Sequence, residues 1–146
     1  MASPPVLVSA CLAGLPCRWD GGATPCDRVL ELVRRGRALP VCPEQLGGLP
    51  TPREPCEIVG GRVVGRYGTD HTAAFERGAR AALALALEAG CREAVLKARS
   101  PSCGSGTIYD GTFTGVATKG DGVFACLLLD NGIMILHEEE IGKSKI

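Results

Sequence analysis

The stretch VLVSACLAGLPC (residues 6–17) decides the fold class of this chain. Residues 6–10 form a continuous apolar run directly after two prolines, a composition typical of a strand that is buried within a parallel sheet. Glycine and proline then interrupt the run, so we expect a loop from Cys11 to Cys17. The stretch therefore predicts a buried strand that ends in a cysteine-bearing loop.

Two further stretches have the same form. Residues 38–42 (ALPVC) predict a second buried strand, and residues 43–53 predict a long, turn-rich loop after it. Residues 93–97 predict a third strand that ends in the loop SPSCGSG, residues 100–106. The other predicted elements are a helix capped by Thr24 that ends at Gly36, a hairpin turning at Gly60 and Gly61, a helix over residues 70–89, a helix over 123–129 and a last strand over 133–136.

Strands that alternate with helices predict an α/β, Rossmann-like fold with a mostly parallel sheet flanked by helices, in a single domain over residues 1–146. Ligands of such sheets bind at the carboxyl ends of the strands. Cys11, Cys42 and Cys103 each lie at or just after the end of a predicted strand. If the three strands are neighbours, these cysteines meet at one edge of the sheet and form a metal or cluster site.

Composition and charge exclude several classes of function. Sixteen Lys and Arg residues balance 16 Asp and Glu residues, and aromatic residues make up only 4% of the chain. A main role in nucleic-acid binding is therefore disfavoured, because such proteins carry a basic footprint and often aromatic platforms. The chain begins without a basic, apolar leader and contains no apolar run long enough to span a membrane. We therefore expect a cytoplasmic protein with reduced thiols.

The eight cysteines do not have the C-x-x-C spacing of zinc ribbons. Cys91 and Cys126 lie in apolar segments and are expected to be small core residues, and the same interpretation is favoured for Cys26 and Cys56. Cys17 falls between these expected core cysteines and the three cysteines at the strand ends. The pattern alone leaves open whether Cys11, Cys42 and Cys103 hold a cluster or provide a reactive thiol.

Three blocks of sequence resemble the DUF523 family, which includes thiouracil desulfidases. The first block is VSACLAG (8–14) with CRWDG (17–21), and the second is VCPEQLGGLPTPR (41–53). The third is LKARSPSCG (96–104) with IYDG (108–111). A single block would be weak, but three blocks in the same order cover nearly the whole chain.

The resemblance implies a [4Fe–4S] cluster that is held by Cys11, Cys42 and Cys103 and leaves its fourth iron open to substrate. It also implies that Glu44 is the acid/base group and that Ser102 helps to position the substrate. The implied reaction is a non-redox desulfidation, in which thiolated uracil or a thiouridine derivative becomes the oxo form and sulfide is released. The expected partner is thus a small thiolated pyrimidine.

Three further residues are candidates for the site. Arg53 and Arg99 are candidate contacts to the base, ribose or phosphate of a substrate, and Cys17 is a possible additional cysteine of the site. Two other functions are weighed against the desulfidase. A hydrolase or sulfurtransferase with Cys11 or Cys103 as nucleophile would need a histidine partner, and neither histidine has an obvious place beside a cysteine. A non-catalytic metal-binding module would be expected to have a closed ligand set.

Overall fold

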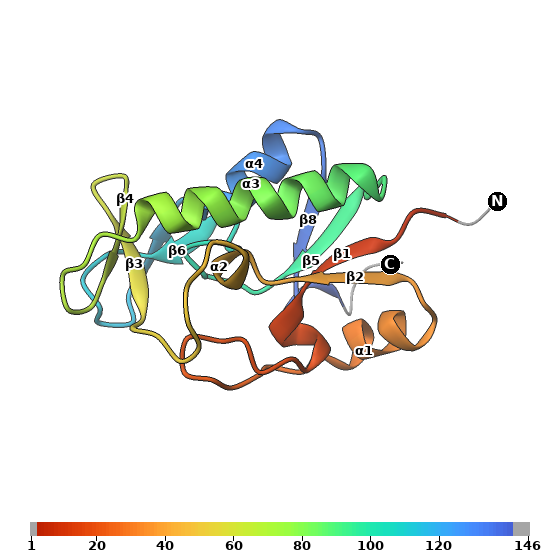
Figure 1. Ribbon diagram of the computed structural model, residues 1–146, viewed down its shortest axis with the longest axis horizontal. Coiled ribbons are helices and arrows are strands. Elements are labelled where there is room, and N and C mark those ends of the chain that lie inside the picture. Colours follow the sequence, from red (N-terminus) through yellow and green to blue (C-terminus); the bar gives the residue numbers. More distant parts are fainter. Residues whose placement is uncertain (1–2, 142–146) are drawn as a thin grey trace.

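The computed structural model describes residues 3–141 and is built on a four-stranded parallel sheet (Figure 1). The strands lie in the order β2-β1-β5-β8. Their bounds are Val6–Ser9 for β1, Ala38–Val41 for β2, Glu93–Leu96 for β5 and Met134–His137 for β8. The predicted α/β architecture, a mostly parallel sheet flanked by helices, is confirmed.

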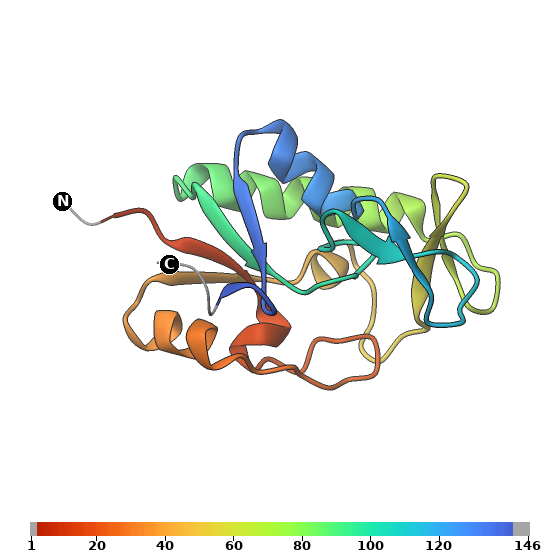
Figure 2. The same ribbon diagram turned by 180° about the vertical axis from the view of Figure 1, so that it is seen from behind.

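The two faces of the sheet are covered by different helices, because alternate residues of a strand point to opposite faces. On one face, Leu7 and Leu96 pack with side chains of α3 (Thr72–Glu88) and α4 (Val123–Asp130). On the other face, Val8 and Val95 pack against η1 (Ala10–Ala13) and α1 (Asp27–Arg34). Figures 1 and 2 show α3 and α4 on one side of the sheet and α1 on the other. No helix within residues 3–141 is both long and apolar enough to cross a membrane.

Two hairpins stand beyond the carboxyl ends of the sheet strands, as Figure 1 shows. The predicted turn at Gly60 and Gly61 is confirmed; it joins the antiparallel strands β3 (Cys56–Val59) and β4 (Arg62–Gly65). The second hairpin, β6 (Thr107–Tyr109) with β7 (Ala117–Lys119), was not expected. Its strands have only three residues each and are largely exposed. Such short, exposed strands do not carry the alternation of apolar and polar residues by which a strand is predicted from sequence.

Local expectations were wrong at three places. The helix after the first loop begins at Asp27 with Cys26 at its N-cap, and the Thr24 hydroxyl instead accepts a hydrogen bond from Arg18 (2.7 Å). The expected loop after β2 contains a one-turn helix, α2 (Pro43–Leu46), with proline in its first turn. Cys126 is exposed rather than buried, because α4 turns its other side toward the core.

Helix α2 lies against α3 with only glycine between the two backbones. A Cβ atom on Gly78 of α3 would overlap the carbonyl oxygen of Pro43, and one on Gly47 would overlap the carbonyl oxygen of Ala74. The Arg77 guanidinium also donates to the carbonyl oxygen of Gly47 (2.6 Å). These contacts fix the short helix that follows Cys42.

We predict that Gly78→Ala lowers the free energy of unfolding by about 1–3 kcal/mol, since the added methyl group overpacks this contact. Helix propensity alone predicts the opposite sign, because alanine is favoured over glycine in a helix interior by about 1 kcal/mol. Urea denaturation measures the difference, with Arg80→Ala on the exposed side of α3 as the control. A Gly78→Ala protein as stable as the wild type would contradict the close packing.

Candidate functional site

A cavity of about 390 Å³ lies at the carboxyl edge of the sheet. The chain turns from β1 to β2 on one side and continues with β5 and β8 on the other, so the strand order reverses at β1. Ligands of open α/β sheets bind at such a point of reversal. Five cysteines line the cavity: Cys11, Cys17, Cys42, Cys56 and Cys103.

Neighbouring strands deliver the three predicted ligand cysteines to this cavity. Cys11 lies in η1 directly after β1, and Cys42 is the N-cap residue of α2 directly after β2. Cys103 lies in the turn after β5, where the Ser100 hydroxyl accepts hydrogen bonds from the backbone N–H groups of Ser102 and Cys103 (3.1 Å each). The structure therefore brings Cys11, Cys42 and Cys103 together, as expected from parallel pairing.

All of these thiols are free, and several have raised pKa values. Burial raises the pKa of Cys103 to about 12 and that of Cys56 to about 12. A hydrogen bond with Cys11 raises the pKa of Cys17 to about 11, and a hydrogen bond with Cys17 raises that of Cys42. The thiol forms of Cys17, Cys42, Cys56 and Cys103 therefore predominate at neutral pH, and a metal must displace protons to bind them.

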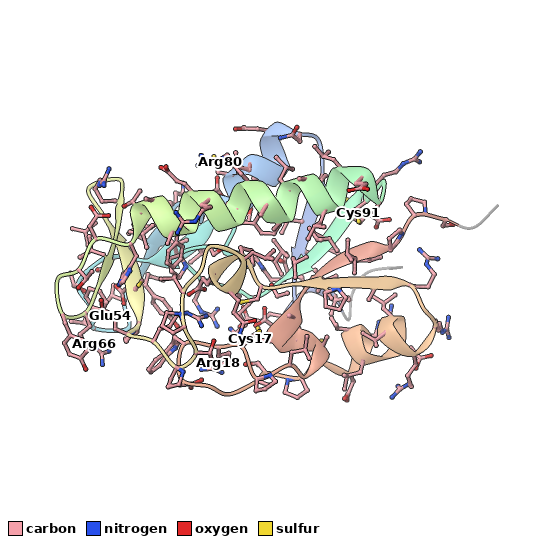
Figure 3. All side chains as sticks on the ribbon, in the orientation of Figure 1. Cys17, Arg18, Glu54, Arg66, Arg80 and Cys91 are labelled. Carbon is pink, nitrogen blue, oxygen red and sulfur yellow. The ribbon has the colours of Figure 1, made fainter. Side chains whose placement is uncertain are left out.

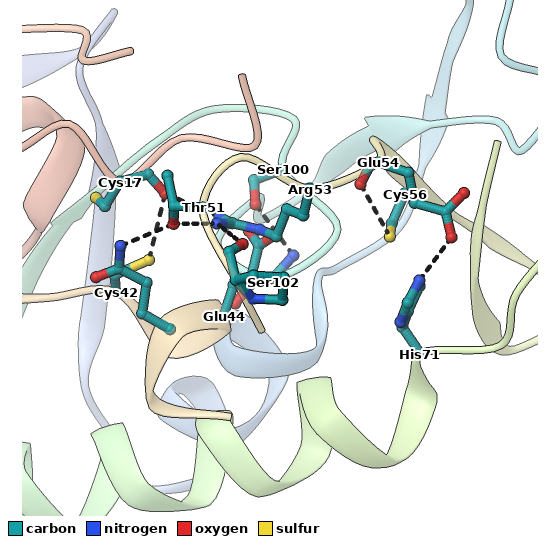
Figure 4. Close-up of polar contacts among 12 residues, drawn as sticks. Cys17, Cys42, Glu44, Thr51, Arg53, Glu54, Cys56, His71, Ser100 and Ser102 are labelled. Carbon is teal, nitrogen blue, oxygen red and sulfur yellow. Dashed lines mark hydrogen bonds and ion pairs between the residues drawn. The ribbon is translucent and has the colours of Figure 1, made fainter. Parts of the chain in front are cut away.

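Glu44 is held at the cavity by Arg53, as Figure 4 shows. Arg53 Nε donates to Glu44 Oε1 (3.0 Å), and the two side chains are only 6% and 19% exposed. The other guanidinium nitrogens donate to the carbonyl oxygen of Cys17 (2.8 Å), the Thr51 hydroxyl (2.9 Å) and the carbonyl oxygen of Pro50 (3.1 Å). Cys42 Sγ donates to the same Cys17 carbonyl oxygen (3.7 Å). One guanidinium therefore joins the carboxylate, the Cys17 loop and the chain after α2.

The structure does not bring Ser102 or Arg99 to the cavity wall. Ser102 is 1% exposed, and its hydroxyl has no hydrogen-bond partner among residues 3–141. Arg99 forms an ion pair with Glu139 (2.9 Å). Their predicted roles toward substrate therefore stay predictions.

Sequence reasoning missed much of the cavity wall. Trp19 and Tyr109 belong to the blocks that resemble the DUF523 family but were not among the predicted site residues, and they line the cavity together with Glu57, Arg66 and Phe113. Glu57 lies in β3, Arg66 directly follows β4, and Phe113 lies in the loop between β6 and β7. These residues reach the cavity only because the hairpins fold toward the sheet edge, which no local sequence pattern predicts. In Figure 3, Cys17, Arg18 and Arg66 all lie below α3, with Arg66 toward the hairpins.

Both histidines are bound to other groups. His71 Nε2 lies 2.7 Å from Glu54 Oε1, an interaction that lowers the pKa of Glu54. His137 Nδ1 lies 2.9 Å from the carbonyl oxygen of Leu96, and its Nε2 accepts a hydrogen bond from the backbone N–H of Ser105 (3.0 Å). Within the described chain, no three His, Cys, Asp or Glu side chains are arranged around a single metal ion.

Comparison with known proteins gives three matches. The family model described as 2-thiouracil desulfurase matches residues 6–140. The uncharacterized protein YbbK of Bacillus subtilis (strain 168) is 42% identical over 146 residues, covering 93% of this chain and 97% of its own. The solved structure of the [4Fe-4S]-dependent thiouracil desulfidase TudS (DUF523) is similar with a TM-score of 0.90 at 47% identity, covering 97% of this chain and 95% of the other.

We predict that Arg53→Gln lowers the free energy of unfolding by at least about 2 kcal/mol, because it leaves a mostly buried carboxylate without its charged partner. Arg34→Gln is the control, since its ion pair with Glu31 is exposed and solvent-screened, so its loss should change stability far less. Denaturant unfolding compares the two. Equal losses would show that the Arg53 network does not hold the site together.

Proposed function

This chain belongs to the 2-thiouracil desulfurase family, and we propose that it is a [4Fe–4S]-dependent desulfidase that hydrolyses the C=S bond of a thiolated uracil. Thiouracil and water give uracil and hydrogen sulfide, so no net electron transfer is required. The observation that carries the proposal is the convergence of Cys11, Cys42, Cys103 and Glu44 on one cavity, in a chain with this family membership.

The residues present fit the cluster. Cysteine thiolates are the ligands of iron–sulfur clusters, and Cys11, Cys42 and Cys103 line the same cavity as free thiols. A [4Fe–4S] cluster binds its cysteines through different irons, so the three sulfurs need not surround a single ion. We assign these three cysteines as ligands, with Cys17 as an additional cysteine beside them. When bound, the cluster supplies a thiophilic Lewis acid with one iron open to substrate.

Glu44 is proposed as the acid/base group. Its carboxyl group lies in the cavity wall, two residues after Cys42, and Arg53 holds one of its oxygens. The Glu44 carboxylate takes a proton from the water whose oxygen adds to the thiocarbonyl carbon. The same group then returns this proton to the departing sulfur as the C–S bond breaks, and the second proton of the water leaves the added oxygen as the C=O bond forms, which completes uracil and hydrogen sulfide.

The remaining predicted residues are assigned supporting roles. Ser102 helps to position the substrate indirectly, through the adjacent Cys103, because its own hydroxyl is buried behind the cavity wall. Arg53 borders the cavity as well as holding Glu44. Arg99 is kept as a candidate contact for a larger substrate, although it pairs with Glu139 in this structure.

We propose a small thiolated pyrimidine as the substrate rather than a nucleic acid. A cavity of about 390 Å³ is of the size that holds small molecules, and the net charge of zero does not favour a polyanion. We also place the protein in the cytoplasm, where its eight cysteines would stay reduced.

Hydrolysis or sulfur transfer by a nucleophilic cysteine has less support. Such a cysteine is activated by an adjacent base, usually histidine. His71 contacts Glu54, and His137 contacts Leu96 and Ser105. Neither histidine ring is paired with a cysteine, whereas Glu44 lines the same cavity as Cys11, Cys42 and Cys103.

We predict that replacing Cys11, Cys42 or Cys103 by alanine each abolishes cluster retention, because each change removes a ligand. The measurement is iron and acid-labile sulfide content after anaerobic reconstitution, with the wild type expected to hold both in about equal amounts. Cys91→Ala is the control, since Cys91 is buried outside the cavity wall. Cluster loss in Cys17→Ala combined with retention in one of the three variants would overturn the ligand assignment.

We predict that Glu44→Gln keeps the cluster and still binds thiouracil but releases sulfide at least about a hundredfold more slowly, because glutamine cannot take the proton. Single-turnover sulfide release in reconstituted protein measures the effect. Glu31→Gln is the control, because Glu31 is an acid on the surface of α1. Near-normal turnover of Glu44→Gln at full cluster content would remove Glu44 from the mechanism.

A further inference from the structure

Phe113 has a backbone conformation that phenylalanine rarely adopts. Its φ is +58°, and Phe113 and Arg99 are the two residues other than glycine with positive φ within residues 3–141. A bulky side chain at positive φ is a true outlier, because its Cβ crowds the following carbonyl oxygen. Strain of this kind persists where the surrounding structure enforces it, and it is concentrated at ligand-binding sites.

A buried carboxylate enforces this conformation. Glu57, which is 8% exposed on β3, accepts hydrogen bonds through Oε1 from the backbone N–H groups of Gly111 (2.9 Å) and Phe113 (3.1 Å). Gly111 also has positive φ, and a Cβ atom there would lie 2.8 Å from the carbonyl oxygen of Ile58. The loop between β6 and β7 is therefore tied closely to β3.

The loop places Phe113 in the wall of the cavity. Arg66 Cζ lies 5.9 Å from the ring centroid, within the range of a cation–π interaction. Trp19 and Tyr109 line the same cavity, so half of the six aromatic residues of the chain border it. The other half are Phe75 and Phe124 in the core and Tyr67, which is 80% exposed.

We infer that Phe113 is a substrate-contact residue whose ring packs against the planar pyrimidine ring, and that Glu57 is the positioning residue that holds it there. Every pyrimidine has a π-face that an aromatic side chain can contact, whatever its ring substituents. A glycine would occupy this backbone position without strain, so the phenylalanine is explained by what its ring contacts in the cavity. This inference rests on the proposed desulfidase function.

The test is Phe113→Gly in the cluster-loaded protein. The variant removes the ring and relieves the backbone strain, so its thermal midpoint should equal or exceed that of the wild type. The KM for 2-thiouracil should rise at least about fivefold, the lower end of the effects seen when a base loses an aromatic stacking partner. A protein that gains stability while losing substrate affinity would separate the contact role from a structural one.

Two further variants serve as controls. Phe113→Tyr keeps the ring and should keep KM within about twofold of the wild type. Tyr67→Ala removes an aromatic residue outside the cavity wall and should leave KM unchanged. Cluster content is measured for each variant, so that changes in KM are compared at equal loading.

A second measurement does not depend on turnover. The dissociation constant of uracil, the expected product, is measured by calorimetry and should rise in Phe113→Gly by a factor similar to the rise in KM. Unchanged KM and uracil affinity in Phe113→Gly, with normal wild-type turnover, would overturn this inference alone. Failure of the cluster-loaded wild type to release sulfide from 2-thiouracil would instead overturn the proposed function.

Discussion

The structure depends on the parallel pairing of β1 between β2 and β5. This arrangement places the ends of all three strands at one edge, with Ser9 opposite Val41 and Val8 opposite Val95 in the register. The cysteines that follow these strands therefore approach one another although they are far apart in the sequence. Because β1 is buried on both faces, a one-residue slip would turn Leu7 and Val8 each toward the opposite helix layer and disrupt the packing of both cores, so packing keeps the edge in place.

The second constraint is the attachment of α2. A helix of one turn is not stable by itself, so its position comes from tertiary contacts. Gly47 and Gly78 allow backbone contact with α3, and Arg53 ties Glu44 to the loop that carries Cys17. Since Cys42 and Glu44 belong to the same short segment, the proposed cluster ligand and the proposed acid/base group are positioned together.

The cavity wall is formed by two parts of the fold, the sheet edge and the hairpins, and each contributes a different set of side chains. The sheet edge contributes the cysteines and Glu44, which are held by the most deeply buried part of the molecule. The hairpins contribute Glu57, Arg66 and Phe113, which border the cavity from the other side. The proposed chemistry therefore resides on the sheet, and the proposed substrate contacts reside on connections that can vary without disturbing the sheet. Because the thiol pKa values on the sheet side are raised, binding of the proposed cluster must also release protons.

The sequence by itself determined the α/β fold, because buried strands and amphipathic helices leave strong periodic patterns in this chain. The positions of Cys11, Cys42 and Cys103 at strand ends predicted their convergence, and the resemblance of its block singled out Glu44; all four line the cavity. Only the tertiary structure decided which side chains complete the cavity wall. The burial of Glu57 and the positive φ of Phe113 depend on a contact between residues 56 positions apart in two different hairpins, for which no local pattern exists. Likewise, the hydrogen-bond partners of Arg53 come from three separate segments, those of Cys17, Glu44 and Thr51. Only the tertiary packing of these segments brings the partners around one guanidinium group.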